Sequence, residues 1–204
     1  MQKFLTRSAL VAGLALATSS AAAEHAAVPS GTYVSDPNHT RLLWRIPHLG
    51  LSHYTARMND VEIRLDFDAE DPSKSSVTAV IDPRSVDTAF TGDKDFDAEI
   101  YGEDAILNAD EHPEIRFAST RVTLTDADSA LVEGELTLLG ATLPVTLEVD
   151  LTGTLEEHPF VKVPAMGFAA EAVFDRTEFG QDFLSGVALG DLVTIEVQTE
   201  LVKM

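Results

Sequence analysis

The chain contains no cysteine among its 204 residues. Disulfide bonds, thiol catalysis and thiolate metal sites are therefore excluded, and stability must come from packing. Basic residues are also scarce, with 14 Lys and Arg against 34 Asp and Glu and a formal net charge of −20. A surface of this sign repels nucleic acid and anionic membranes, so we expect no nucleic-acid partner. Such a surface also suits a salty habitat.

Long apolar runs are absent, apart from one short run near the amino terminus. Lys3 and Arg7 precede the apolar residues 9–17, and three alanines follow and end at Ala23. This arrangement is typical of a secretory signal peptide, since about ten apolar residues are too few to span a bilayer. A single membrane anchor is the alternative. We expect a signal peptide at 1–23, a linker at 24–30 and an exported domain at 31–204.

Alternation of apolar and polar residues dominates the remaining sequence. It is clearest at 61–67, 115–118, 145–151, 166–174 and 193–201. A period of two with one polar face is typical of antiparallel strands. The sequence therefore predicts an all-β domain.

Turn-forming residues separate these strands at short intervals. Segment 131–151 has the pattern of a hairpin with Gly140 at its turn. Residues 93–109 fit one or two short helices, and 155–165 carry two prolines and fit a long loop. About eight strands suffice to close a barrel, which removes exposed sheet edges. The periodicity alone leaves a two-sheet sandwich open as the alternative.

A series of short motifs in a fixed order resembles the YceI family, over residues 31–201. The motifs are YVSDPNHT at 33–40, HLGLS at 48–52, DPSKSSV at 71–77, SVDT at 85–88, DEHPEIRFAST at 110–120, EGELTLLG at 133–140, PVTL at 144–147, DRTEFG at 175–180 and VTI at 193–195. Each motif alone is weakly specific, whereas the ordered set is strongly so.

The resemblance implies an eight-stranded, lipocalin-like antiparallel barrel with a helical excursion at 93–109, located in the periplasm. It also implies an apolar tunnel that binds a long-chain isoprenoid or a similar amphiphilic lipid such as a quinone. Three features depart from the family pattern. Pro47 stands where a strand would continue, and 89–95 is acidic where the family commonly carries basic residues. Residues 156–165 are also unusual in carrying two prolines.

Large apolar side chains at inward positions are the expected ligand contacts. Small inward residues, such as Ala170, Ala172, Ser119 and Thr199, would leave volume inside a barrel; an ordinary closed core is the alternative. The expected ligand-binding residues are Trp44, Ile46, His48, Leu49, Leu51, Met58, Phe67, Phe117, Met166, Phe168 and Phe174.

The stretch 37–59 contains no Asp or Glu, which is unusual in a chain with 34 acidic residues. Arg41, Arg45 and His53 fall in this stretch and are the candidates for binding a polar or phosphorylated head group. A chance gap in the charge pattern is the alternative.

No residue pattern supports catalysis or a metal site. The six histidines show no His-x-His or His-Glu-x-x-His spacing, Ser185 lacks the Gly-x-Ser-x-Gly motif, and no phosphate-binding glycine loop is present. We therefore expect a non-enzymatic carrier without a resident cofactor, acting as a monomer or homodimer in transient contact with membranes. The alternative function is an acidic interaction or stress-tolerance module with a solid core and no lipid ligand.

Overall fold

The computed structural model describes residue 25 and residues 27–204; the expected signal peptide at 1–23 lies outside the described residues. The strands are β1 (Gly31–Ser35), β2 (Arg41–His48), β3 (Ser52–Met58), β4 (Val61–Phe67), β5 (Ser76–Ile81), β6 (Val86–Asp87), β7 (Ile115–Leu124), β8 (Ser129–Leu138), β9 (Ala141–Leu155), β10 (Ala165–Asp175) and β11 (Leu192–Lys203). The helical segments are η1 (Pro72–Lys74), η2 (Pro83–Ser85), α1 (Phe96–Gly102) and η3 (Arg176–Phe179).

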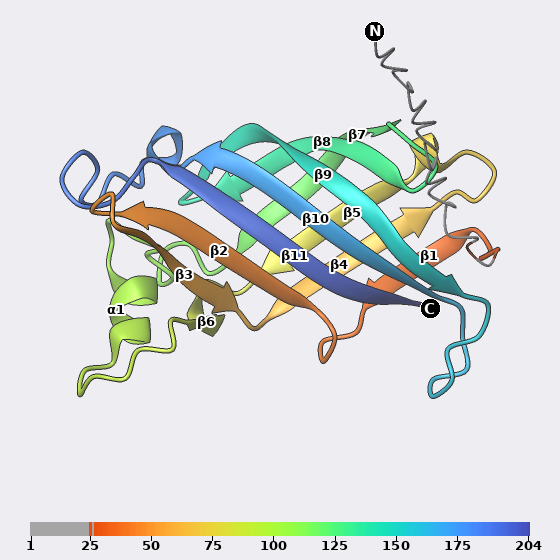
Figure 1. Cartoon of the computed structure of the whole chain (residues 1–204), viewed down its shortest axis with the longest axis horizontal. Helices are drawn as coiled ribbons and strands as arrows, with labels where there is room; N and C mark the ends of the chain where they lie inside the picture. Colours follow the sequence, from red (N-terminus) through yellow and green to blue (C-terminus); the bar gives the residue numbers. More distant parts are fainter. Residues whose placement is uncertain (1–24, 26) are drawn as a thin grey trace, which may run out of the picture.

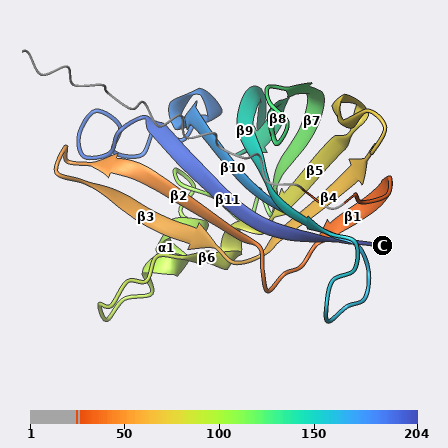
Figure 2. The same ribbon diagram turned by 45° about the vertical axis from the view of Figure 1, so that its right-hand side comes forward.

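In the described part of the chain, antiparallel pairing closes eight strands into a barrel (Figures 1 and 2). The ring runs β1-β4-β5-β7-β8-β9-β10-β11, and β11 pairs back onto β1 through Leu201 and Ser35. This closure confirms the antiparallel barrel and excludes the open sandwich. No helix in the described residues is both long and apolar enough to cross a membrane.

Strands β2, β3 and β6 extend the wall beyond this ring. The same edge of β11 pairs first with β2, at Thr194 to Gln198, and then with β1, at Leu201 to Lys203. β1 and β2 therefore act as one bent strand, and β3 and β4 as its partner. Pro47 lies beyond the last β2–β11 pair, Arg45 with Thr194, so its missing N–H removes no bond to β11.

Alternation along each strand decides which side chains enter the barrel. In β4, Val61 is buried, whereas its polar neighbours Glu62 and Arg64 are exposed. β8 and β9 form the predicted hairpin, in which Val132 faces Leu147. Ser119, expected among the small residues that leave volume inside the barrel, does not line the interior space. Its hydroxyl accepts a hydrogen bond from the Val77 N–H at 2.9 Å, and a register shift of β7 against β8 follows directly, between Ser119 and Arg121.

The expected helical excursion at 93–109 contains one short helix, α1, which lies at one end of the barrel (Figure 1). Asp95 caps it by accepting a hydrogen bond from the Ala98 N–H at 3.0 Å. Acidic side chains in the first turn, at Asp97 and Glu99, suit the positive end of the helix dipole. The helix ends at Gly102 and buries Ile100 against the barrel.

Candidate functional site

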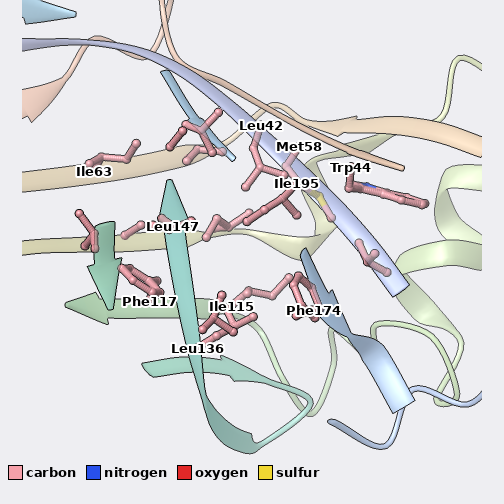
Figure 3. Close-up of a pocket in the computed structure, with 18 of the residues that line it drawn as sticks. Leu42, Trp44, Met58, Ile63, Ile115, Phe117, Leu136, Leu147, Phe174 and Ile195 are labelled. Atoms are coloured by element: carbon pink, nitrogen blue, oxygen red, sulfur yellow. The ribbon is translucent and has the colours of Figure 1, made fainter. Parts of the chain in front are cut away.

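The barrel encloses a cavity of about 710 Å³. Its walls are the inward side chains of β4, β9, β10 and β11, among them Ile63, Leu147, Phe168 and Ile195. Figure 3 shows labelled aliphatic and aromatic side chains from several strands pointing toward a common space. A volume of this size falls in the range of sites that enclose small ligands.

Nine of the eleven residues predicted to bind a ligand line this cavity. The strand alternation brings them together because each occupies an inward position. They are Trp44, Ile46, His48, Met58, Phe67, Phe117, Met166, Phe168 and Phe174. Two of the small residues, Ala170 and Thr199, also line the cavity and leave space between the larger groups.

Leu49 and Leu51 are not among the cavity-lining residues, contrary to the sequence expectation. They lie at the turn between β2 and β3, where Leu49 and Gly50 both have positive φ angles of 54° and 66°. Both leucines also differ in parity from the inward residues Trp44, Ile46 and His48 of β2, and they are 55% and 84% exposed.

The three head-group candidates also lie outside the cavity. Arg41 donates to the carbonyl oxygen of Pro37 at 2.9 Å, and Arg45 forms an ion pair with Glu196 at 2.5 Å. His53 is exposed on β3. Arg41 and Arg45 alternate with the inward residues of β2, which places them on the outer face.

Among the residues that the structure describes, two buried nitrogen donors in the cavity wall have no hydrogen-bond partner: Trp44 Nε1 and Arg176 Nη2. The Arg176 side chain is 1% exposed. Its Nε donates to the carbonyl oxygen of Gly190 at 2.9 Å, and its Nη1 donates to that of Gln181 at 2.7 Å. Burial lowers the pKa of the Arg176 guanidinium, an effect opposed by the carboxylates of Asp191, Asp175 and Asp182. An unpaired buried donor is unfavourable unless a ligand supplies an acceptor.

Arg176 was missed as a site residue by the sequence analysis. An arginine that directly follows the amphipathic strand β10 would ordinarily be assigned to the surface. Asp175 turns the chain inward at this point, accepting hydrogen bonds from the Thr177 N–H at 2.9 Å and the Thr177 hydroxyl at 2.7 Å. These bonds lower the pKa of Asp175 and start η3. The sequence feature that could have pointed to Arg176 is the DRTEFG motif at 175–180, one of the motifs that carry the family resemblance.

Aromatic contacts connect the barrel wall to α1. The Trp44 and Tyr54 rings lie 6.1 Å apart, and the Tyr54 and Phe96 rings meet edge to face at 6.2 Å. Phe96 belongs to α1 and lines the cavity with Ile100. The helix therefore forms part of the cavity wall at this end.

Chemically, this arrangement suits the enclosure of an apolar molecule. The described residues contain no group of three or more His, Asp or Glu side chains placed to hold a metal ion. The titratable residues that line the cavity include His48, Glu99 and Glu103, beside a large majority of apolar groups.

Comparison with known proteins identifies relatives along most of the chain. A family model described as a YceI-like domain matches residues 33–201. A UPF0312 protein of Pectobacterium atrosepticum is 33% identical over 179 residues, which cover 88% of this chain and 86% of the relative. A UPF0312 protein of Pseudomonas aeruginosa is 33% identical over 170 residues, covering 83% and 85%.

Solved structures share the fold at low identity. BcnA of Burkholderia cenocepacia superposes with a TM-score of 0.69 at 18% identity, covering 81% of this chain and 98% of BcnA. A polyisoprenoid binding domain from Saccharophagus degradans, implicated in plant cell wall breakdown, gives a TM-score of 0.59 at 10% identity, covering 86% and 99%. The family match spans the barrel from β1 to β11, and the chain therefore belongs to the YceI-like family.

Proposed function

We propose that this protein binds and carries a long-chain isoprenoid or a similar amphiphilic lipid, without catalysing a reaction. The observation that carries the proposal is the cavity of about 710 Å³, whose lining is dominated by aliphatic and aromatic side chains. A polyisoprenoid binding domain with the same fold supports the class of ligand. In this proposal the nine inward residues named above contact the hydrocarbon chain.

The apolar lining supplies the affinity. Each buried methylene contributes about 0.8 kcal/mol, so a five-carbon isoprene unit contributes up to about 4 kcal/mol before ordering costs. Several units together approach the practical ceiling of about 18–21 kcal/mol for non-covalent binding. Release into water is then slow, and the lipid should remain bound during purification.

The polar end of the ligand would meet the unpaired donors of the cavity wall. Trp44 Nε1 and Arg176 Nη2 each lack an acceptor within residues 27–204. A carbonyl, hydroxyl or phosphate oxygen would provide one, which supports an oxygen-bearing head group such as that of a quinone or a polyprenol. This assignment replaces Arg41, Arg45 and His53, whose side chains lie outside the cavity.

The proposed setting is the periplasm, reached through the signal peptide expected at 1–23. A carrier of such lipids must load and unload at a membrane, so transient membrane contact is part of the proposal. Monomer and homodimer are both compatible with a cavity enclosed within one chain.

Displacement of a hydrophobic fluorophore tests the proposal. The fluorophore should bind to delipidated protein with a stoichiometry near one and should be displaced by a long-chain quinone or polyprenol. The acidic interaction module with a solid core predicts no saturable binding. Absence of binding in protein shown to be folded and lipid-free would overturn the proposed function.

A further inference from the structure

Two loops at one end of the barrel expose large apolar side chains. One is the β2–β3 hairpin turn and the other is the segment 180–191 between β10 and β11; Figure 1 shows both on the left, far from the β9–β10 loop. The exposed apolar residues of these loops, called here the apolar tip, are Leu49, Leu51, Phe183, Leu184 and Val187.

Backbone hydrogen bonds hold the two loops together. The Leu49 N–H donates to the Ala188 carbonyl oxygen at 2.7 Å, and the Gly190 N–H donates to the Pro47 carbonyl oxygen at 2.9 Å. His48 and Leu189 also form an isolated β-bridge. The apolar tip is therefore one joined surface contributed by two distant parts of the sequence.

Two leucines of the apolar tip adopt a backbone conformation that disfavours them. Leu49 has a φ of 54° and Leu184 a φ of 53°, in the left-handed region where glycine and asparagine fit better. Leu49 is 55% exposed and does not line the cavity, so burial does not offset its strain, whereas Leu184 is 43% exposed and lines the cavity. Folding alone therefore does not account for leucine at position 49, and such strain is typical of functional surfaces.

The apolar tip is continuous with the cavity. Phe183 and Leu184 are exposed and also line the cavity. His48, at the end of β2, and Leu189, in the β10–β11 loop, line the cavity beside them. The segments 37–59 and 183–190 contain no Asp or Glu, although Asp182 and Asp191 flank the second segment and α1 adds acidic side chains at the same end. The apolar tip itself therefore combines apolar exposure with access to the cavity and carries no acidic residue.

We propose that the apolar tip docks on the surface of a zwitterionic phospholipid bilayer, and that the ligand passes there between the bilayer and the cavity. This inference rests on the proposed function, because the exposed apolar surface continues into the proposed lipid site. The net charge of −20 opposes anionic bilayers, which is why a zwitterionic surface is specified. Insertion of exposed leucines into the interface supplies the attraction.

Flotation of the full protein with phosphatidylcholine vesicles tests the docking. The test variant is Leu49→Asn/Leu51→Ser/Val187→Ser, whose three positions do not line the cavity. Asparagine is well suited to the positive φ at position 49, so the fold should be retained. The matched control is Phe160→Ser/Val161→Ser, which removes two exposed apolar residues from the β9–β10 loop at the opposite end.

We expect the wild-type protein and the control to float with phosphatidylcholine vesicles, and the tip variant to lose at least about ten-fold in partitioning, equivalent to about 1.4 kcal/mol. Vesicles rich in phosphatidylglycerol should bind the wild-type protein more weakly. Fluorophore binding in solution should be equal in all three proteins, which separates docking from the lipid site. A vesicle interaction that the tip variant retains, or a tip-dependent dimer in place of vesicle binding, would overturn the inference. Absence of fluorophore binding by the folded, lipid-free wild-type protein would instead overturn the proposed function.

Discussion

The Arg176 guanidinium donates through Nη1 to the backbone carbonyl oxygen of Gln181 at 2.7 Å. The Gln181 side-chain amide in turn donates to the carbonyl oxygen of Ile106 at 2.7 Å. These bonds connect η3, the β10–β11 loop and the segment that follows α1. One buried arginine thereby fixes the closure of the barrel end at which Trp44 meets α1 through the aromatic contacts.

Replacing Arg176 by Met should destabilise the protein by about 2–5 kcal/mol, because the half-buried carbonyl oxygens of Gln181 and Gly190 lose their donor. The free energy of unfolding in urea measures the effect. Arg64→Met is the control, since the contacts of Arg64 with Asp66, Thr32 and Met204 are all exposed and their loss should change stability by less than about 1 kcal/mol. Equal effects of the two variants would contradict the structural role of Arg176.

A side chain at Gly134 should disturb the cavity wall. A Cβ there would lie 2.6 Å from the Ala118 carbonyl oxygen and would collide with the Phe117 ring, which lines the cavity. Gly134→Ala should therefore cost about 1–3 kcal/mol of stability. At Gly153, also in a strand, a Cβ meets nothing within 4 Å, so Gly153→Ala should stay within about 0.5 kcal/mol. Thermal and urea unfolding of both variants measures the two losses of stability. A loss for Gly134→Ala no larger than that for Gly153→Ala would contradict the prediction.

Filling the cavity should abolish ligand binding without unfolding the barrel. Ala170 lines the cavity, whereas its neighbour Ala169 does not. Ala170→Trp should weaken fluorophore and quinone binding by at least about ten-fold, and Ala169→Trp should leave binding near the wild-type level. Isothermal titration of delipidated proteins provides the comparison. Binding that tolerates Trp at position 170 would place the ligand elsewhere.

Trp44→Phe should weaken binding of an oxygen-bearing isoprenoid more than binding of a hydrocarbon of equal length. The change keeps an aromatic ring in the wall and removes the unpaired Nε1–H. A hydrogen bond is worth about 0.5–1.5 kcal/mol, so the expected difference is about two- to ten-fold. Competition between a polyprenol and its parent hydrocarbon measures it. A uniform loss for both ligands would show that only packing had changed.

His39 should titrate above its ordinary pKa of 6.5. The hydrogen bond to Asp36 at 3.0 Å is the main cause of the raised pKa, and the charge of Glu200 adds to it. Its contribution to stability is therefore complete below pH 6.5 and is lost as the pH rises through the folded-state pKa. NMR titration of the His39 ring should show the shift, and Asp36→Asn should reduce it. A pKa at or below 6.5 in the wild-type protein would refute the assignment.

Local alternation predicted five of the barrel strands, β4, β7, β9, β10 and β11, whereas closure into a barrel was implied by the family resemblance. Val145, Leu147 and Val149 on β9 are inward because a strand places alternate residues on one face. The same reasoning placed Trp44 and Phe117 in the cavity wall. The hairpin at 131–151 and the helix within 93–109 were likewise confirmed, since turn residues and capping residues act over short distances.

The residues that were misplaced depend on contacts between distant segments. Leu49 and Leu51 lie beyond the end of β2 in a turn that is hydrogen-bonded to the loop 183–190. Ser119 sits at a register shift that only pairing with β8 reveals. Arg176 becomes buried because the β10–β11 loop supplies carbonyl acceptors, and no local pattern encodes that arrangement.

Mass spectrometry of the solvent extract from freshly purified, detergent-free protein would show whether the cavity holds a lipid. We expect close to one equivalent of a long-chain isoprenoid amphiphile with an oxygen-bearing head group, and its loss in Ala170→Trp but not in Ala169→Trp. Repeated lipid-free preparations, together with an interior filled by side chains in an experimental structure, would rule out the proposed lipid carrier.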